Sequence, residues 1–324
     1  MGYAPRAWLL PRAGGQSRRA SQLYTGYSAP LAWRDYGFTS YPLAVSNIPA
    51  RLYGSLLTEA VNRQHPKLIV VDIDGFLTDE DPEKLEANLR KWLDNMPWSR
   101  NRIETIRTCV PAELQTSFYF NIAKYHANWY QPDAWLPVQQ RLRAMDKTGY
   151  SLTKSFEAIG QSLTDADQPD TRPLTLSGAN AQYLRDFCAQ ARSLGTNVLF
   201  LRMPHRTQTT DPNVFADVAA VVGGYGYELL DLHDAFDTIG LDRCADFMDS
   251  DHLNAIGMET FTAWFGQYLS EHYDLTTAHS ETVTAEWQRC ADFMAQILPT
   301  CQQQAADNTK QTLNEFSAAF DAYR

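Results

Sequence analysis

The stretch KLIVVDI, residues 67–73, decides the fold class of this chain. Its continuous apolar run, rich in β-branched residues, predicts a strand buried on both faces of a parallel sheet. Two further strands are predicted at 197–201 (NVLFL) and 227–232 (YELLDL), and helical patterns occupy 179–194 and 212–222 between them. The alternation of strands and helices predicts an α/β fold whose parallel sheet is covered by helices on both faces.

Helical periodicity extends beyond this unit in both directions. Residues 48–64 carry apolar side chains on one face, and residues 255–272 bury several aromatic side chains. Beyond about residue 280 the spacing predicts a helix that breaks at Pro299 and another helix after it. We therefore expect residues 276–324 to form a helical C-terminal extension.

The composition restricts the class of protein. Of 324 residues, 44% are hydrophobic, which is enough for a globular core. The net charge of −10 argues against a nucleic-acid partner, because phosphate binding needs clustered lysine and arginine. The five cysteines are scattered without a CxxC pair, so neither a disulfide framework nor a metal site is indicated.

The N-terminal residues lack a clear pattern. Residues 1–19 contain four arginines and one short apolar island at 7–10, which ends in Pro11. The island is too short for the core of a signal peptide, and no run in the chain reaches the length that crosses a membrane. We expect residues 1–19 to be irregular or disordered.

The segment Asp249-Ser-Asp-His252-Leu-Asn carries the clearest chemical signal. A carboxylate three residues before a histidine can accept its Nδ1 proton, which leaves the other ring nitrogen to take a proton from a hydroxyl nucleophile. Asp251 competes for this role, but its position beside His252 makes it point elsewhere. The alternative interpretation is an Asp- and Asn-rich turn that caps the following helix.

Several segments of the chain resemble the SGNH (GDSL-like) hydrolases. DSDHLNAIG resembles their last sequence block, in which an Asp-x-x-His pair precedes the final helix. Other blocks look like a bacterial cell-envelope subgroup related to D-alanyl-transfer and alginate O-acetylation proteins. These blocks are residues 20–44, 65–77, 94–106, 124–129 and 242–270. The resemblance implies an α/β three-layer, flavodoxin-like SGNH domain over residues 20–275.

The resemblance also implies a reaction, which is ester hydrolysis or O-acyl transfer by a serine nucleophile. The matching serine is Ser21, with His252 as its base and Asp249 orienting the imidazole. The glycine that usually precedes this serine in the family is absent here. Ser46 and Asn47 are the candidates for the oxyanion hole.

Three more residues are candidate substrate contacts. His126 stands in the aromatic stretch YHANW, where a packed structural histidine is the alternative interpretation. His205 and Arg206 follow the strand at 197–201, so they are expected at the carboxyl edge of the sheet. For these two residues a solvated loop is the alternative.

The substrate and location are implied by the resemblance alone. It implies an acylated glycan or small ester as substrate, an acyl-transfer partner associated with the membrane, and a place at the cell envelope or outside the cytoplasm. No cofactor and no metal are needed for acyl transfer of this kind. The oligomeric state is left open.

Two other functions remain. The string VVDIDGFLTD resembles the first motif of haloacid-dehalogenase-type phosphatases, which would make Asp72 a nucleophile and Asp74 a general acid beside Mg²⁺. Phe76 replaces the threonine of that motif, and no later block supplies its lysine and acidic ligands in order. The third function is a catalytically inert SGNH scaffold that binds glycan.

Overall fold

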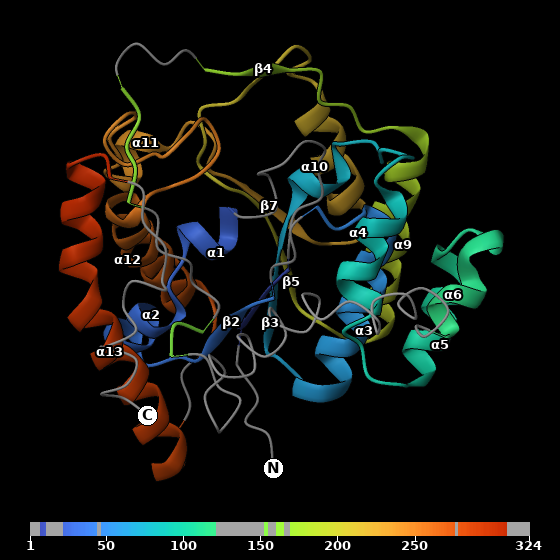
Figure 1. Cartoon of the computed structure of the whole chain (residues 1–324), viewed down its shortest axis with the longest axis horizontal. Helices are drawn as coiled ribbons and strands as arrows, with labels where there is room; N and C mark the ends of the chain where they lie inside the picture. Colours follow the sequence, from blue (N-terminus) through green and yellow to red (C-terminus); the bar gives the residue numbers. More distant parts are fainter. Residues whose placement is uncertain are drawn as a thin grey trace, which may run out of the picture.

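The structure is a computed structural model, in which five parallel strands form a central sheet (Figure 1). It describes residues 7–10, 22–43, 47–120, 152–154, 160–164, 169–275 and 278–309. The strands of the sheet are β1 (Ala7–Leu10), β2 (Ser40–Pro42), β3 (Leu68–Asp72), β5 (Val198–Arg202) and β7 (Glu228–Asp231). The expected α/β fold with a parallel sheet is confirmed.

The strands lie in the order β2-β1-β3-β5-β7, and each pairs in parallel with its neighbours. Counted along the chain within this sheet, the order is 2-1-3-4-5, one of the two common orders of doubly wound sheets. The direction of connection reverses beside β1, where such sheets open a crevice at their carboxyl edge. A short ribbon of β4 (Thr171–Arg172) and β6 (Gln208–Thr209) forms a separate parallel pair.

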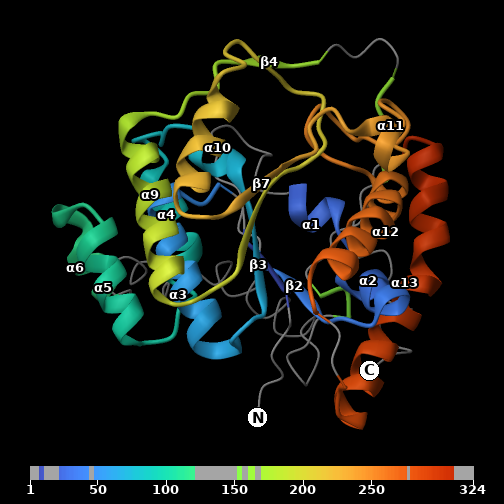
Figure 2. The same ribbon diagram turned by 180° about the vertical axis from the view of Figure 1, so that it is seen from behind.

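Helices cover both faces of the sheet, as Figures 1 and 2 show from opposite sides. One face carries α1 (Gln22–Gly26), α2 (Ala29–Tyr36), α11 (Phe236–Ile239), α12 (Ala255–His272) and α13 (Glu281–Ala306). The other carries α3 (Tyr53–Gln64), α4 (Leu85–Leu93), α5 (Arg100–Cys109), α6 (Gln115–Tyr119), α9 (Gly178–Ser193) and α10 (Val214–Gly224). Short 3-10 turns are η1 (Ala50–Leu52), η2 (Ile73–Phe76) and η3 (Ala112–Leu114).

The strand β3 explains why both faces must be covered. Leu68 and Val70 belong to the core under α2 and α12, whereas Ile69 and Val71 belong to the core under α3 and α9. Successive side chains of a strand point to opposite faces, so an unbroken apolar run buries residues on both. All four side chains are fully buried, and each such burial contributes about 1.5–3 kcal/mol.

The structure corrects the expectation of an irregular segment over residues 1–19. Residues Ala7–Leu10 form β1, which lies inside the sheet and pairs with β2 on one side and β3 on the other. An interior strand has backbone partners on both edges, which stabilises even a run of four residues. Such a run is shorter than most strands, so the sequence pattern did not identify it as a strand. The other residues of 1–19 lie outside the described part of the chain.

The expected break at Pro299 is also wrong, because α13 continues through it from Glu281 to Ala306. A proline inside a helix removes one hydrogen bond and costs about 3 kcal/mol. The buried face of α13 continues on both sides of the proline, with Ile297 and Leu298 before it and Cys301 and Ala305 after it. Packing against α2 and α12 offsets the cost. The second helix expected near 313–320 lies outside the described residues.

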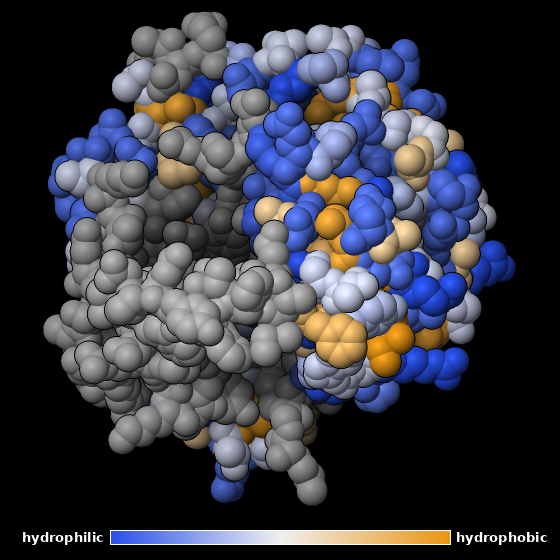
Figure 3. All heavy atoms as spheres, turned by 45° about the vertical axis from the view of Figure 1, so that its right-hand side comes forward, coloured by the Kyte–Doolittle hydropathy of each residue, from blue (hydrophilic) through white to orange (hydrophobic). Residues whose placement is uncertain are grey.

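The described surface is largely hydrophilic in the view of Figure 3, with separate hydrophobic patches. Large apolar side chains that are exposed in the described residues are Trp98, Ile103, Phe120 and Leu194. In the described part of the chain, no helix has both the length and the apolar character that crossing a membrane requires.

Close packing at the start of α12 gives a stability prediction. A Cβ at Gly257 would clash with the carbonyl oxygen of Asp246 and would lie 2.9 Å from Leu253. We expect Gly257→Ala to lower the free energy of unfolding by about 1–3 kcal/mol through overpacking. Gly223→Ala is the matched control, since a Cβ there meets nothing within 4 Å. That control should change stability by no more than about 1 kcal/mol, in the stabilising direction. Equal effects in urea denaturation would contradict the prediction.

Candidate functional site

Backbone contacts join the two ends of the loop that precedes α12, residues 247–253. Phe247 and Leu253 form an antiparallel bridge, and the Met248 N–H donates to the carbonyl of His252 at 2.8 Å. Asn254 caps α12, because its side-chain oxygen accepts from the N–H groups of residues 256 and 257. Residues 249–252 are therefore held between a bridge and a helix N-terminus.

Asp249 binds the ring of His252 within this loop. Its Oδ1 accepts from His252 Nδ1 at 2.7 Å, from the His252 N–H at 3.0 Å and from the Asp251 N–H at 2.9 Å. The backbone contacts are those of an Asx turn, in which an Asp side chain accepts from its own backbone two residues later. The local sequence thus places the carboxylate against the imidazole, with the His252 side chain 1% exposed and that of Asp249 26% exposed.

The charge of this pair follows from its contacts. Burial raises the pKa of the Asp249 carboxyl, but the hydrogen bond and charge of His252 and the N–H of Asp251 outweigh it and hold the pKa below its usual range. The carboxylate is therefore ionised at neutral pH and only accepts hydrogen bonds. His252 Nδ1 then carries a proton, and in the neutral ring Nε2 is the basic nitrogen.

Asp251 points away from the imidazole, as the sequence indicated. Its Oδ2 lies 2.7 Å from Arg172 Nη1, and its Oδ1 accepts from the Thr207 hydroxyl. Arg172 also pairs with Asp170. Asp251 is 4% exposed, so its charge is buried and compensated by that of Arg172.

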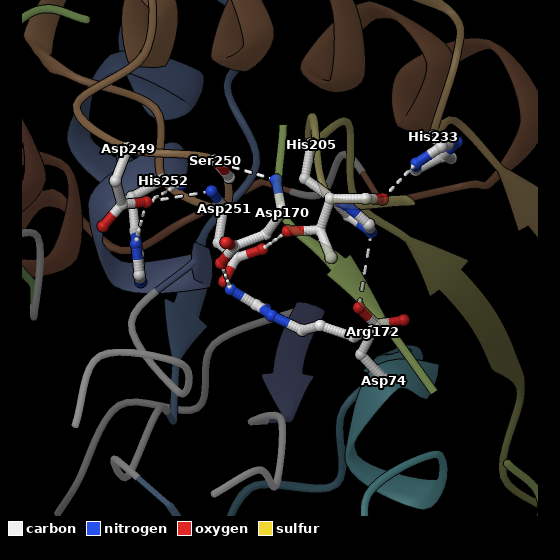
Figure 4. A network of polar contacts seen from close by, with 10 residues as sticks. Asp74, Asp170, Arg172, His205, His233, Asp249, Ser250, Asp251 and His252 are labelled. Atoms are coloured by element: carbon white, nitrogen blue, oxygen red, sulfur yellow. Dashed lines mark hydrogen bonds and ion pairs between the residues drawn. The ribbon is translucent and has the colours of Figure 1, made fainter. Parts of the chain in front are cut away.

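The polar contacts continue from Thr207 across the carboxyl edge of the sheet (Figure 4). The Thr207 carbonyl lies 2.8 Å from His233 Nε2, and the rings of His233 and His205 meet edge to face with centroids 4.5 Å apart. His205 Nε2 lies 3.4 Å from Asp74 Oδ2. These groups follow β3, β5 and β7, whose carboxyl ends share one edge.

The burial of His205 and Arg206 does not fit the interpretation as a solvated loop. Both side chains are buried rather than solvated, and His205 is fully so. The Arg206 N–H donates to the Ser250 carbonyl at 2.7 Å, which connects the loop after β5 to the loop of His252. His205 instead belongs to the group around Asp74, so it is not brought against His252 by any described contact.

The remaining candidates are placed only in part. Ser21, Ser46 and His126 lie outside the described residues. Asn47 is described after β2, with a φ of 56° in the left-handed region that asparagine tolerates. No hydrogen bond among the described residues joins it to the pair of Asp249 and His252.

The residue after Ser21 begins α1, and this helix lies beside the loop of His252. A Cβ at Gly26 would be 3.4 Å from a methyl group of Leu253. Helix α1 also packs against α12, and the Ser28 N–H donates to Thr262 Oγ1 on α12 at 3.0 Å. The chain that follows Ser21 is thus anchored beside Leu253, the residue after His252, and against α12.

Sequence reasoning did not single out Thr207, His233 or Arg172 as members of the network. His233 directly follows Leu232 at the carboxyl end of a predicted strand, which is the same signal that singled out His205. Arg172 lies in β4, a strand of two residues, and its contact with Asp251 spans 79 positions of the chain. Nothing in the local pattern marks it.

A pocket of about 350 Å³ lies on the other face of the sheet, among α3, α5 and α9. Its lining includes Ser55, Thr105 and Gln190, whose polar groups hydrogen-bond to neighbouring residues. It contains neither Asp249 nor His252, so it is separate from the candidate site. Among the described residues, no group of three His, Cys, Asp or Glu side chains is arranged to hold a metal ion.

Comparison with known proteins gives no match: no family model, no curated protein and no solved structure matches this chain. The likeness to SGNH hydrolases stays a resemblance in sequence motifs.

The lowered pKa of Asp249 gives a pH prediction. A carboxyl whose folded pKa lies below its unfolded value of about 3.9 contributes stability above that value and loses it as the pH falls through the folded pKa. We expect the free energy of unfolding to differ more between wild type and Asp249→Asn at about pH 5 than at about pH 3. Asp237→Asn, on an exposed carboxylate of α11, is the control. If urea titrations showed the same difference between wild type and Asp249→Asn at both pH values, the prediction would be contradicted.

Proposed function

We propose that this protein is a serine esterase or O-acyltransferase of SGNH type that acts on acyl esters of cell-envelope glycans. One observation carries the proposal: the Asp249 carboxylate binds His252 Nδ1 at 2.7 Å, immediately before α12. This contact fixes the tautomer and the ring orientation that a general base needs. A turn that only capped α12 would need Asn254 alone, since Asn254 already binds the first N–H groups of the helix.

The architecture agrees with a site at this place. The sheet order 2-1-3-4-5 is that of a three-layer flavodoxin-like fold, in which ligands bind beyond the carboxyl ends of the strands. The N–H groups of Arg206 and Thr207, after β5, donate to the Ser250 carbonyl in the loop of His252, and His233, after β7, binds the Thr207 carbonyl. This agreement supports an SGNH-type domain, whose final block contributes the acid–base pair.

Ser21 is the proposed nucleophile. Its Oγ attacks the ester carbonyl while its proton passes to His252 Nε2, and the tetrahedral intermediate then expels the alcohol, which takes that proton. Water or a second hydroxyl group next attacks the acyl-serine with His252 again as base, which releases the acid or forms a new ester. Support comes from α1, which begins directly after Ser21 and packs beside Leu253. Asn47 remains a candidate donor to the oxyanion.

The glycan substrate, the cell-envelope location and a membrane-associated acyl-transfer partner rest on the resemblance of sequence blocks. The chemistry itself requires no cofactor, because the serine, the imidazole and the carboxylate supply nucleophile, base and orientation. Hydrolysis and transfer share the acyl-enzyme, so they differ only in the acceptor that reaches it.

The phosphatase alternative is less well supported. Asp72 ends β3 at the carboxyl edge, as a nucleophile of that class would. However, Asp72 and Asp74 are both 0% exposed, and the backbone N–H of Asp74 donates to Asp72 Oδ1. Asp74 also lies against His205. A phosphate group would have to displace these contacts before reaching either carboxylate.

Ester hydrolysis tests the proposal directly. With p-nitrophenyl acetate, we expect His252→Ala to lower kcat/KM by about 10²–10⁴-fold, the contribution of a positioned general base. Ser21→Ala should reduce hydrolysis to the background rate, and a fluorophosphonate should label wild type at the peptide that contains Ser21. Ser193→Ala, which alters an exposed hydroxyl on α9, is the control. Unchanged hydrolysis in Ser21→Ala and His252→Ala would contradict the assignment.

The two alternative functions, a phosphatase and an inert scaffold, predict different results from an esterase. A phosphatase would hydrolyse p-nitrophenyl phosphate with Mg²⁺ and lose this activity in Asp72→Asn, whereas we expect no Mg²⁺-dependent hydrolysis from the wild type. An inert glycan-binding scaffold would hydrolyse neither substrate and would resist the fluorophosphonate. Mass spectrometry of the labelled peptide separates that scaffold from an esterase with a narrow substrate range.

A further inference from the structure

We propose that Arg172 is a positioning residue that orients the pair of Asp249 and His252 through Asp251. Its relevance to catalysis rests on the proposed function, but its effect on the pair itself does not. Arg172 does not contact the imidazole in any described interaction. Its guanidinium binds Asp251, whose backbone in turn binds Asp249.

The ion pair fixes the Asp251 carboxylate at both oxygens. Oδ2 lies 2.7 Å from Arg172 Nη1, and Oδ1 accepts from the hydroxyl of Thr207. The side chains of Arg172 and Asp251 are 13% and 4% exposed, so solvent screens their attraction weakly. Removal of the guanidinium would take away the positive charge that compensates this buried carboxylate, and such a charge moves toward water if the loop allows it.

A displacement of Asp251 would directly disturb its hydrogen bond to Asp249. The Asp251 N–H donates to Asp249 Oδ1 at 2.9 Å, and this is the oxygen that holds His252 Nδ1. The carbonyl on the other side of that peptide bond belongs to Ser250 and accepts from the Arg206 N–H at 2.7 Å. A rotation of this peptide would therefore break contacts on both sides of it and would change the direction from which Asp249 meets the ring.

Arg172 is itself held in place from outside the loop. Its strand β4 pairs with β6, so Arg172 lies opposite Thr209, close in sequence to Thr207. The Gln208 N–H donates to the Asp170 carbonyl at 2.7 Å, and the carboxylate of Asp170 gives Arg172 a second, more exposed partner. The ribbon of β4 and β6 thus provides a fixed base for the guanidinium (Figure 4).

The experiment follows the Nδ1 proton of His252 by NMR and the hydrolysis of p-nitrophenyl acetate on the full chain. A hydrogen bond to a carboxylate protects this proton from exchange and shifts its resonance downfield, and its absence in His252→Ala assigns it. In Arg172→Gln we expect this resonance to be lost through faster exchange. We also expect kcat to fall by about 10–100-fold with KM unchanged, because the base is displaced and no substrate contact is removed.

Two further variants separate positioning from general stability. Arg172→Lys keeps one charged contact, so it should recover the resonance and much of the lost kcat. Arg107→Gln removes an ion pair with Glu104 that is exposed on α5, and should alter neither readout. If Arg172 acts through Asp251, Arg172→Gln and Asp251→Asn combined should have no larger effect than the more severe single variant.

The outcomes are distinct. A protected resonance in Arg172→Gln, an equal loss in Arg107→Gln, or additive losses in the double variant would overturn the positioning role. Absence of the resonance in the wild type would overturn it too, since the pair would then not form. A wild type that neither hydrolyses p-nitrophenyl acetate nor reacts with the fluorophosphonate, but loses the resonance in Arg172→Gln, would refute the proposed function and leave the positioning role intact.

Discussion

The parallel sheet is the constraint on which the rest of this structure depends. Parallel strands need a crossover between each pair, so both faces of the sheet are covered, and every strand ends at the same edge. Asp72 at the end of β3, Arg202 at the end of β5 and Asp231 at the end of β7 therefore converge, and Arg202 Nη1 lies 3.3 Å from Asp231 Oδ2. The gathering of charged side chains at this edge is a consequence of the strand direction.

Convergence of charged groups at a buried edge has an energetic cost that shapes the site. Burial lowers the pKa of the Arg202 guanidinium, against the attraction of Asp74 and Asp231. An isolated buried charge would be far more costly, so the acidic groups here stand beside cationic or ionisable partners. Asp74 meets His205, and Asp251 meets Arg172. These pairs give the edge a defined geometry that an apolar edge of the same shape would lack.

The sequence predicted what depends on neighbouring residues. The strands β3 and β5 and the helix α12 follow from local periodicity, and the contact of Asp249 with His252 spans three positions. The strand β1 was not predicted, because four apolar residues become a strand only between two partners. The continuation of α13 through Pro299 and the link from Arg172 to Asp251 also depend on packing between distant segments, which one sequence does not display.

The candidate site therefore combines two kinds of specification. The orientation of His252 relative to Asp249 is encoded within one short loop, whereas the position of that loop relative to α1 depends on the packing of α1 on α12 and on contacts made by Thr207 and Arg206. A pair of this kind forms wherever the loop folds, but it becomes a base only if a hydroxyl group is brought to its free side. The proposed function therefore requires the long-range contacts of the loop as well as the local motif.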